Sequence, residues 1–293
     1  MSVMTVGKSP GLPQSTIPMS KYHLPHDGPE HARLEEQSDA IIAVMGGHTI
    51  HAPLPSTITR AIDVGCGTGT TTVHLGHRFP SASVWGIDLS AVPDLHQKPA
   101  NVSYIQGDIL ELARNDDRLR PASLDYCYSR LIPLGMDNWT GYVNTVFNLL
   151  KPGAWMELQE LDFAFFDKDS RPIDTQWKWL REMRYAARQK GLDMNSGSHS
   201  LSYLQGAGFT NVTTTEYAWP LGQWKAHPEG DLMAKHSTST WPDIFSHLIR
   251  AMLRKTKTDA EIAPLVEEVR RTLVPGEEGK HMKFYVTLGR KPL

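Results

Sequence analysis

The sequence predicts a doubly wound α/β fold, in which helices cover both faces of a mainly parallel sheet. Short apolar segments alternate with helical segments between residues 60 and 159, a spacing typical of such sheets. A glycine-rich turn, Gly65–Gly69, joins the first apolar segment to a helix. Asp88 and Asp108 closely follow the next two predicted strands, where doubly wound sheets bind ligands. The length of 293 residues fits one large domain or two small ones.

The N-terminal half opens with a predicted helix over residues 29–45. Pro29 suits its first turn, Leu34 and Ile41 lie on one apolar face, and Gly46 ends it. The alternating region that follows is predicted to contain strands at 60–64, 83–87, 102–106, 124–129 and 155–159, and helices at 70–78 and 139–150.

The alternation loosens after residue 160. Helices are predicted at 173–190 and 241–254, and strands at 209–217 and 284–288. The residues Asn195–His199 are predicted to form a turn-rich loop. Thr258 and Glu261 form a capping box that begins a further helix.

Composition and charge exclude several classes of protein. The formal net charge is −2, so no basic surface for nucleic acid or an anionic membrane is expected. Two cysteines are too few for a disulfide scaffold. No continuous apolar span reaches the ~20 residues of a transmembrane helix, and the N-terminus lacks a secretion signal. We therefore expect a soluble protein of the cytoplasm, with the nucleus as an alternative location.

The glycine turn indicates which kind of ligand binds. The segment Asp63-Val64-Gly65-Cys66-Gly67-Thr68-Gly69 has its third glycine one residue too early for the dinucleotide pattern, and it lacks the lysine of a P-loop. Asp63 would repel a pyrophosphate but suits a cationic ligand. An ordinary strand–turn–helix without a ligand remains the alternative.

An acidic residue followed by G-x-G-x-G resembles the first motif of class I S-adenosylmethionine (SAM) methyltransferases. The segment Leu149–Trp155 is similar to that family's L-K-P-G-G element, with Ala154 in place of the second glycine. The resemblance implies SAM as cofactor, S-adenosylhomocysteine as product, and three groups of contacts. The amino acid part would be held by Asp63, Gly65, Cys66, Gly67 and Gly69, the ribose by Asp88 with Leu89, and the adenine by Asp108 with Ile109.

Flanking segments narrow the resemblance to fungal LaeA-like methyltransferases. These segments are Tyr22–Asp27, Glu157–Asp162, Trp219–Trp224 and Phe284–Pro292, so the resemblance covers roughly residues 22–293. It implies a seven-stranded Rossmann-like sheet with an antiparallel final hairpin, an N-terminal covering segment and a helical lid insert. Family members are tailoring enzymes of secondary metabolism or SAM-binding regulators with velvet-type partners.

On this basis the chain divides into five segments. Residues 1–20 are a disordered tail, 21–58 a helical cap, and 59–160 the SAM-binding core. Residues 161–280 hold the lid helices and the sixth strand, and 281–293 return as the final strand of the core sheet.

Further site residues are expected from their positions. Tyr22 from the N-terminal segment, and Ser129 and Arg130 after the fourth strand, are predicted cofactor contacts. Arg130 has the alternative of a structural salt bridge. Predicted substrate contacts are His23, Trp177 and Trp224, because tryptophans gathered in the variable half suit a flat or apolar molecule.

Three residues are candidates for general acid–base catalysis. His199 and His236 lie in the variable half, and Glu160 follows the fifth strand, where pairing with Arg130 is its alternative role. No metal is expected, because His74 and His77 are three residues apart but lack a third ligand.

The predicted function is methyl transfer from SAM to a small molecule, a fungal secondary metabolite with an oxygen acceptor favoured. One alternative is a regulator that acts with protein partners, and another is a methyltransferase fold that catalyses a different reaction. The expected partner is the small-molecule acceptor, with a homodimer or a velvet-type protein as further partners and no direct nucleic acid contact.

Overall fold

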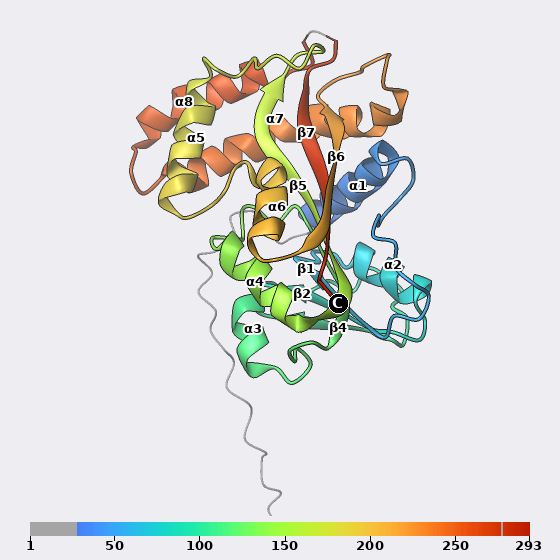
Figure 1. The fold of residues 1–293 in the computed structure, drawn as a ribbon. Coiled ribbons are helices and arrows are strands. Elements are labelled where there is room, and N and C mark those ends of the chain that lie inside the picture. The colour runs from blue at the N-terminus through green and yellow to red at the C-terminus, as the bar shows by residue number, and fades with distance from the viewer. Residues whose placement is uncertain (1–27, 277) are drawn as a thin grey trace, which may run out of the picture.

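The computed structural model describes residues 28–276 and 278–293. These residues form a seven-stranded sheet with the order β3-β2-β1-β4-β5-β7-β6 (Figure 1). The strands are β1 (Arg60–Val64), β2 (Ser83–Asp88), β3 (Val102–Gln106), β4 (Leu124–Arg130), β5 (Leu150–Phe166), β6 (Thr210–Pro220) and β7 (His281–Arg290). Strands β1 to β5 pair in parallel, and β7 lies antiparallel between β5 and β6. The predicted doubly wound sheet and its antiparallel final pair are confirmed.

Helices cover both faces of the sheet and the carboxyl ends of its strands. They are α1 (Gly28–Val44), α2 (Thr70–Arg78), α3 (Ile109–Asn115), α4 (Trp139–Leu149), α5 (Lys178–Gln189), α6 (Ser196–Gly206), α7 (Asp231–Leu253) and α8 (Asp259–Thr272), with a short 3₁₀ turn, η1 (Pro228–Gly230). Apolar residues of α3, α4 and α6 pack on one face, and those of α2 on the other. Figure 1 shows α5, α7 and α8 together near the end of the sheet where β5 finishes and β7 begins.

The fifth strand is longer than predicted. We expected it to end at residue 159, but β5 continues to Phe166. The added residues pair with β7, from Leu161 opposite Phe284 to Phe166 opposite His281, and Phe163 and Phe165 are buried against the helices beyond. The predicted boundary between core and lid, at residues 160 and 161, therefore lies inside a continuous strand.

Two helices begin elsewhere than predicted. The helix expected from residue 173 begins at Lys178, because the Ile173 N–H donates to the Phe165 carbonyl at 3.0 Å and keeps that segment extended. The helix expected from residue 241 begins at Asp231, before its apolar stripe.

The prediction of a loop at Asn195–His199 is wrong, because α6 begins at Ser196. The short helix α3 was not anticipated, although the Asp108 carboxylate caps it by accepting from the Leu110 N–H at 2.9 Å. The predicted capping box of Thr258 and Glu261 is confirmed at the start of α8. None of the helices within the described ranges is both long and apolar enough to cross a membrane.

Candidate cofactor and acceptor site

The glycine turn after β1 adopts a backbone that only glycine accepts easily. Gly65 and Gly69 have φ angles of 70° and 87°, in the left-handed region that disfavours a Cβ atom. A Cβ on Gly65 would also collide with the Ile132 side chain, and one on Gly69 with the Tyr104 hydroxyl. The turn therefore presents backbone without intervening side chains at these two glycines, and it can pack closely against its neighbours.

Asp88 at the end of β2 holds this turn in place. Its carboxylate accepts from the Gly67 N–H and from the Ser90 N–H, both at 2.9 Å. The Gly65 N–H donates to the Ile87 carbonyl at 2.8 Å. The strand end and the glycine turn are thus one hydrogen-bonded unit.

Asp63 lies at the end of β1 with only 2% of its surface exposed. It accepts a hydrogen bond from the Thr72 hydroxyl at 2.6 Å. Burial raises the pKa of Asp63 to about 6, although the Thr72 hydroxyl and the positive charge of Arg130 oppose this effect. Such a carboxyl gains from a nearby cation, which would favour its ionised form.

Arg130 at the end of β4 connects the sheet to α1. Its Nη2 donates to the Ser38 hydroxyl at 2.8 Å. Its buried Nη1 has no hydrogen-bond partner among residues 28–276 and 278–293. A buried guanidinium nitrogen without a partner is costly, so this side of the site suits an anionic group.

These elements surround one cavity of about 230 Å³. Of the predicted cofactor residues, the following line it: Asp63, Gly65, Cys66, Gly67, Asp88, Leu89, Asp108, Ile109 and Arg130. Gly69 is not part of the lining but precedes α2 as its left-handed N-cap. Ser129 does not line the cavity either, since its side chain lies on the other face of β4 beside Tyr142. Tyr22 lies outside the described residues.

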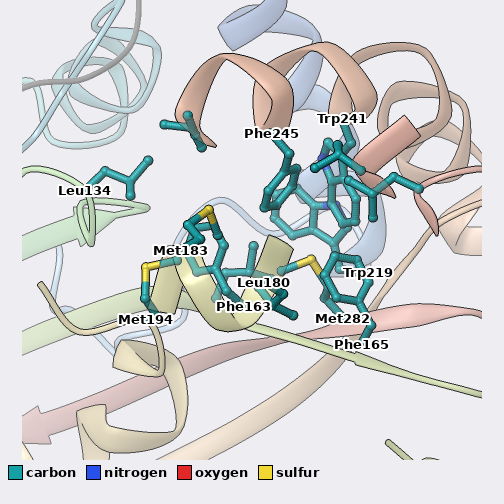
Figure 2. Close-up of a cluster of buried hydrophobic side chains, with 14 of the residues drawn as sticks. Leu134, Phe163, Phe165, Leu180, Met183, Met194, Trp219, Trp241, Phe245 and Met282 are labelled. Carbon is teal, nitrogen blue, oxygen red and sulfur yellow. The ribbon is translucent and has the colours of Figure 1, made fainter. Parts of the chain in front are cut away.

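The far end of the cavity is apolar and aromatic. Trp219 of β6 and Trp241 of α7 stack with ring centroids 6.0 Å apart. Figure 2 shows Trp241 and Phe245 of α7 facing Trp219 and Phe163 from the sheet. All four side chains line the cavity. The Trp219 indole N–H donates to the Ser237 hydroxyl at 3.0 Å, which fixes the orientation of that ring.

The predicted substrate contacts are not the tryptophans that line the cavity. Trp177 packs beside Phe165 and Trp179, and Trp224 lies between His227 and His281. Neither side chain reaches the cavity lining. His23 lies outside the described residues.

The three candidates for acid–base catalysis also lie outside the cavity lining. His199 is on the surface of α6, with its Nδ1 2.8 Å from Asp193. His236 is buried between α7 and α1, and burial together with the charge of Arg33 lowers its pKa to about 4. Glu160 is fully buried, and burial raises its pKa to about 8.

The expected alternative of a Glu160–Arg130 ion pair does not occur between these described residues, because Arg130 faces the cavity and Glu160 does not. Within the described ranges no group of three or more His, Cys, Asp or Glu residues is placed to hold a metal ion.

The site also contains residues that sequence reasoning missed. The loop after β4, residues 131–137, lines the cavity, and so do Arg33, Leu34 and Gln37 of α1. The apolar face predicted for the first helix was the available signal for α1. Nothing local marked the loop, whose side chains become cavity walls only through the packing of the sheet.

A family model described as a methyltransferase domain matches residues 30–214, more than half of the chain. The chain belongs to this methyltransferase family. It is a SAM-dependent methyltransferase, and its predicted resemblance to LaeA-like proteins is confirmed by the relatives below.

The methyltransferase is similar to several known proteins. It is 24% identical over 278 residues to methyltransferase pytC of Aspergillus terreus, covering 92% of this chain and 83% of that protein. It is 28% identical over 219 residues to the secondary metabolism regulator laeA of Coprinopsis cinerea, covering 68% of this chain and 53% of the regulator. The match thus spans about half of the regulator's length.

A solved structure shares the fold. Phosphoethanolamine N-methyltransferase 2 of Haemonchus contortus, in complex with S-adenosyl-L-methionine, superposes with a TM-score of 0.51 at 17% identity. The superposition covers 93% of this chain and 54% of that chain.

The cavity of this methyltransferase fits the chemical groups of SAM. The unpartnered Arg130 Nη1 suits a carboxylate, and the buried Asp63 suits a cationic group. In the glycine turn, Gly67 is the glycine with open space in front of it, because a Cβ there would meet only Leu34 within 4 Å. All three features belong to residues of the chain itself.

Proposed function

We propose that this methyltransferase methylates an apolar, flat small molecule, with oxygen as the acceptor atom. The observation that carries the proposal is that a single cavity joins a polar end at the glycine turn to an aromatic end under α7. Aromatic side chains pack well against flat rings. A hydroxyl on such a ring, with a pKa near 10 like that of tyrosine, ionises more readily than an alkyl alcohol, which favours oxygen.

The polar end is assigned to the cofactor. Asp63 and the turn Gly65–Thr68 would hold the amino acid part, with Arg130 at its carboxylate. Asp88 and Leu89 would contact the ribose, and Asp108 and Ile109 the adenine. SAM, when bound, supplies an electrophilic methyl group on a sulfonium.

The shape of the cavity would orient the acceptor and exclude water. Trp219, Trp241 and Phe245 would hold the acceptor ring at a fixed angle to the polar end, since alignment lowers the barrier of a displacement reaction. The apolar wall would also exclude water, which competes as a nucleophile. Cys66 is not required as a nucleophile, because methyl transfer from a sulfonium passes directly to the acceptor, and burial also raises the pKa of its thiol.

The test is a methylation assay with two matched tryptophan variants. Purified protein is incubated with SAM and flat phenolic compounds, and a mass gain of one methylene unit identifies a product. Trp241→Leu should raise the KM for the acceptor about tenfold, as expected for lost aromatic packing, and leave SAM affinity unchanged. Trp177→Leu removes a tryptophan outside the cavity and should change neither. Equal losses in both variants would show that the aromatic end is not the acceptor site.

A second candidate is a regulator that binds SAM and acts with protein partners, as the similarity to a secondary metabolism regulator suggests. Recovery of a stoichiometric protein partner from a fungal extract, with no methylated small molecule formed, would favour it. Whether the wild-type protein forms a methylated small molecule in the assay above distinguishes the small-molecule methyltransferase from the regulator.

A further inference from the structure

The loop between β4 and α4, residues 131–137, forms an unbroken part of the cavity wall. Ile132 fills the space in front of Gly65, where a Cβ atom would collide with its Cγ2. The position of this loop therefore decides the shape of the cavity beside the glycine turn.

The loop begins in an unfavourable backbone conformation. Leu131 has a φ angle of 54°, in the left-handed region that a residue with a Cβ rarely adopts. Such a conformation persists only where surrounding contacts hold it. Two hydrogen bonds to β5 do so here. The Leu131 N–H donates to the Gln159 carbonyl at 3.0 Å, and the Ile132 N–H donates to Glu160 Oε1 at 3.3 Å.

The second of these bonds comes from a side chain placed behind the site. Leu161 and Phe163 of β5 line the cavity, and successive side chains of a strand point to opposite faces. Glu160 consequently points away from the cavity, toward α6, and is 0% exposed. Its carboxyl group also faces the Ser196 hydroxyl at the start of α6.

We propose that Glu160 is a positioning residue that holds loop 131–137 in its cavity-forming conformation and acts on cofactor binding through Ile132. This inference deepens the proposed function, because it rests on the cofactor occupying this cavity. It replaces the direct acid–base role that the sequence suggested for Glu160.

The same strand offers a matched control. Asp162 lies two residues further along β5, on the same face, and is 7% exposed. Its carboxylate accepts from the Ser198 N–H at 2.9 Å and therefore contacts α6, not the loop. If buried acids on this face of the sheet had only a structural role, substitutions of Glu160 and of Asp162 would have equal effects.

Glutamine is the conservative replacement at position 160. Burial raises the pKa of Glu160 to about 8, with the Ile132 N–H and the Ser196 hydroxyl acting against it, so at pH 7 most molecules carry the neutral acid. Glutamine has nearly the same shape and keeps a carbonyl that accepts from Ile132. Methionine keeps the length of the side chain but removes the acceptor.

The experiment measures S-adenosylhomocysteine affinity by calorimetry and amide hydrogen exchange of the ligand-free protein. Glu160→Met should weaken affinity about tenfold and speed exchange in loop 131–137 about tenfold, as expected when a buried N–H loses its acceptor. Glu160→Gln should restore both to within about twofold. Asp162→Leu should leave affinity and loop exchange unchanged and speed exchange only at the start of α6.

Equal losses in Glu160→Met and Asp162→Leu, or an unchanged loop in Glu160→Met, would overturn the inference. If Glu160→Met fails to fold, Glu160→Ala takes its place in the same comparison. If the wild-type protein does not bind S-adenosylhomocysteine, the proposed function fails, whereas the exchange rates still decide whether Glu160 holds the loop.

Discussion

The buried Asp63 carboxyl should make cofactor affinity depend on pH. Without ligand, burial raises its pKa to about 6. The ammonium group of the cofactor, assigned to this end of the cavity, stabilises the ionised carboxylate and not the neutral acid. Binding therefore requires Asp63 to lose its proton. Below pH 6 the free energy of this deprotonation makes the binding free energy of the cofactor less favourable.

The magnitude follows from the pKa. At pH 5 about ten of every eleven ligand-free molecules carry the proton, whereas at pH 7 about one in eleven does. The Kd for S-adenosylhomocysteine should therefore be about tenfold higher at pH 5 than at pH 7, a difference of about 1.4 kcal/mol. Asp63→Asn should bind more weakly at every pH and lose this slope.

Stability should change in the opposite direction to affinity. The pKa of Asp63 is higher in the folded protein, about 6, than its ordinary value of 3.8. An acid whose pKa is raised by folding stabilises the folded state at low pH, and this contribution is lost as pH rises from about 4 to about 6. The loss amounts to about 3 kcal/mol. Ligand-free Asp63→Asn should therefore unfold at a higher urea concentration than wild type at pH 7.

The assay is isothermal titration at pH 5, 6 and 7, together with urea unfolding of the ligand-free proteins. Asp125→Asn is the control, because Asp125 lies near the opposite end of β4, paired with Lys151 at 2.7 Å, and should keep the wild-type slope. Equal wild-type affinity at pH 5 and pH 7, or an unchanged slope in Asp63→Asn, would refute the assignment of Asp63 to the cofactor ammonium.

Three further predictions concern single side chains. Arg130→Met should weaken S-adenosylhomocysteine binding by about 2 kcal/mol, the worth of a charged hydrogen bond, which raises the Kd about thirtyfold. Titration calorimetry that finds an unchanged Kd would contradict the carboxylate contact. Burial lowers the pKa of His236 to about 4 in the folded protein, so the unfolded chain takes up the proton first as pH falls, and wild type should lose at most about 3 kcal/mol of stability between pH 6.5 and pH 4. His236→Leu should not show this loss. Thermal unfolding of both proteins across that pH range tests it. Thr258→Ala should cost about 1 kcal/mol in urea unfolding by removing the cap of α8, and an unchanged midpoint would show that α8 does not depend on its capping box.

Local patterns were sufficient to predict which residues meet at the polar end of the cavity. The glycine turn, Asp63, Asp88 and Asp108 are all set by strand ends that short apolar runs reveal, and each of these residues lines the cavity or its turn. Their placement depends on a few neighbouring residues, which is why the sequence alone was sufficient to predict where they lie.

The aromatic end of the cavity was not predictable in the same way. Trp177 directly precedes α5 and Trp241 lies within α7, yet only Trp241 lines the cavity. The difference arises because α7 crosses α1 and β6, a tertiary contact with no local signal. Glu160 lies elsewhere than expected for a related reason. Because β5 extends to Phe166 by pairing with β7, Glu160 lies inside a strand, with its side chain on the face away from the cavity.

The position of β7 between β5 and β6 has a consequence for how the protein folds. Trp155 of β5 pairs with Arg290 of β7, so the sheet joins segments far apart in sequence. Such pairing closes a large loop, which slows folding. During synthesis, the edge of β5 stays unprotected until β7 has left the ribosome, and an exposed apolar strand edge invites association with other chains. The strand that carries part of the cavity wall is therefore also an open sheet edge until synthesis of β7 is complete.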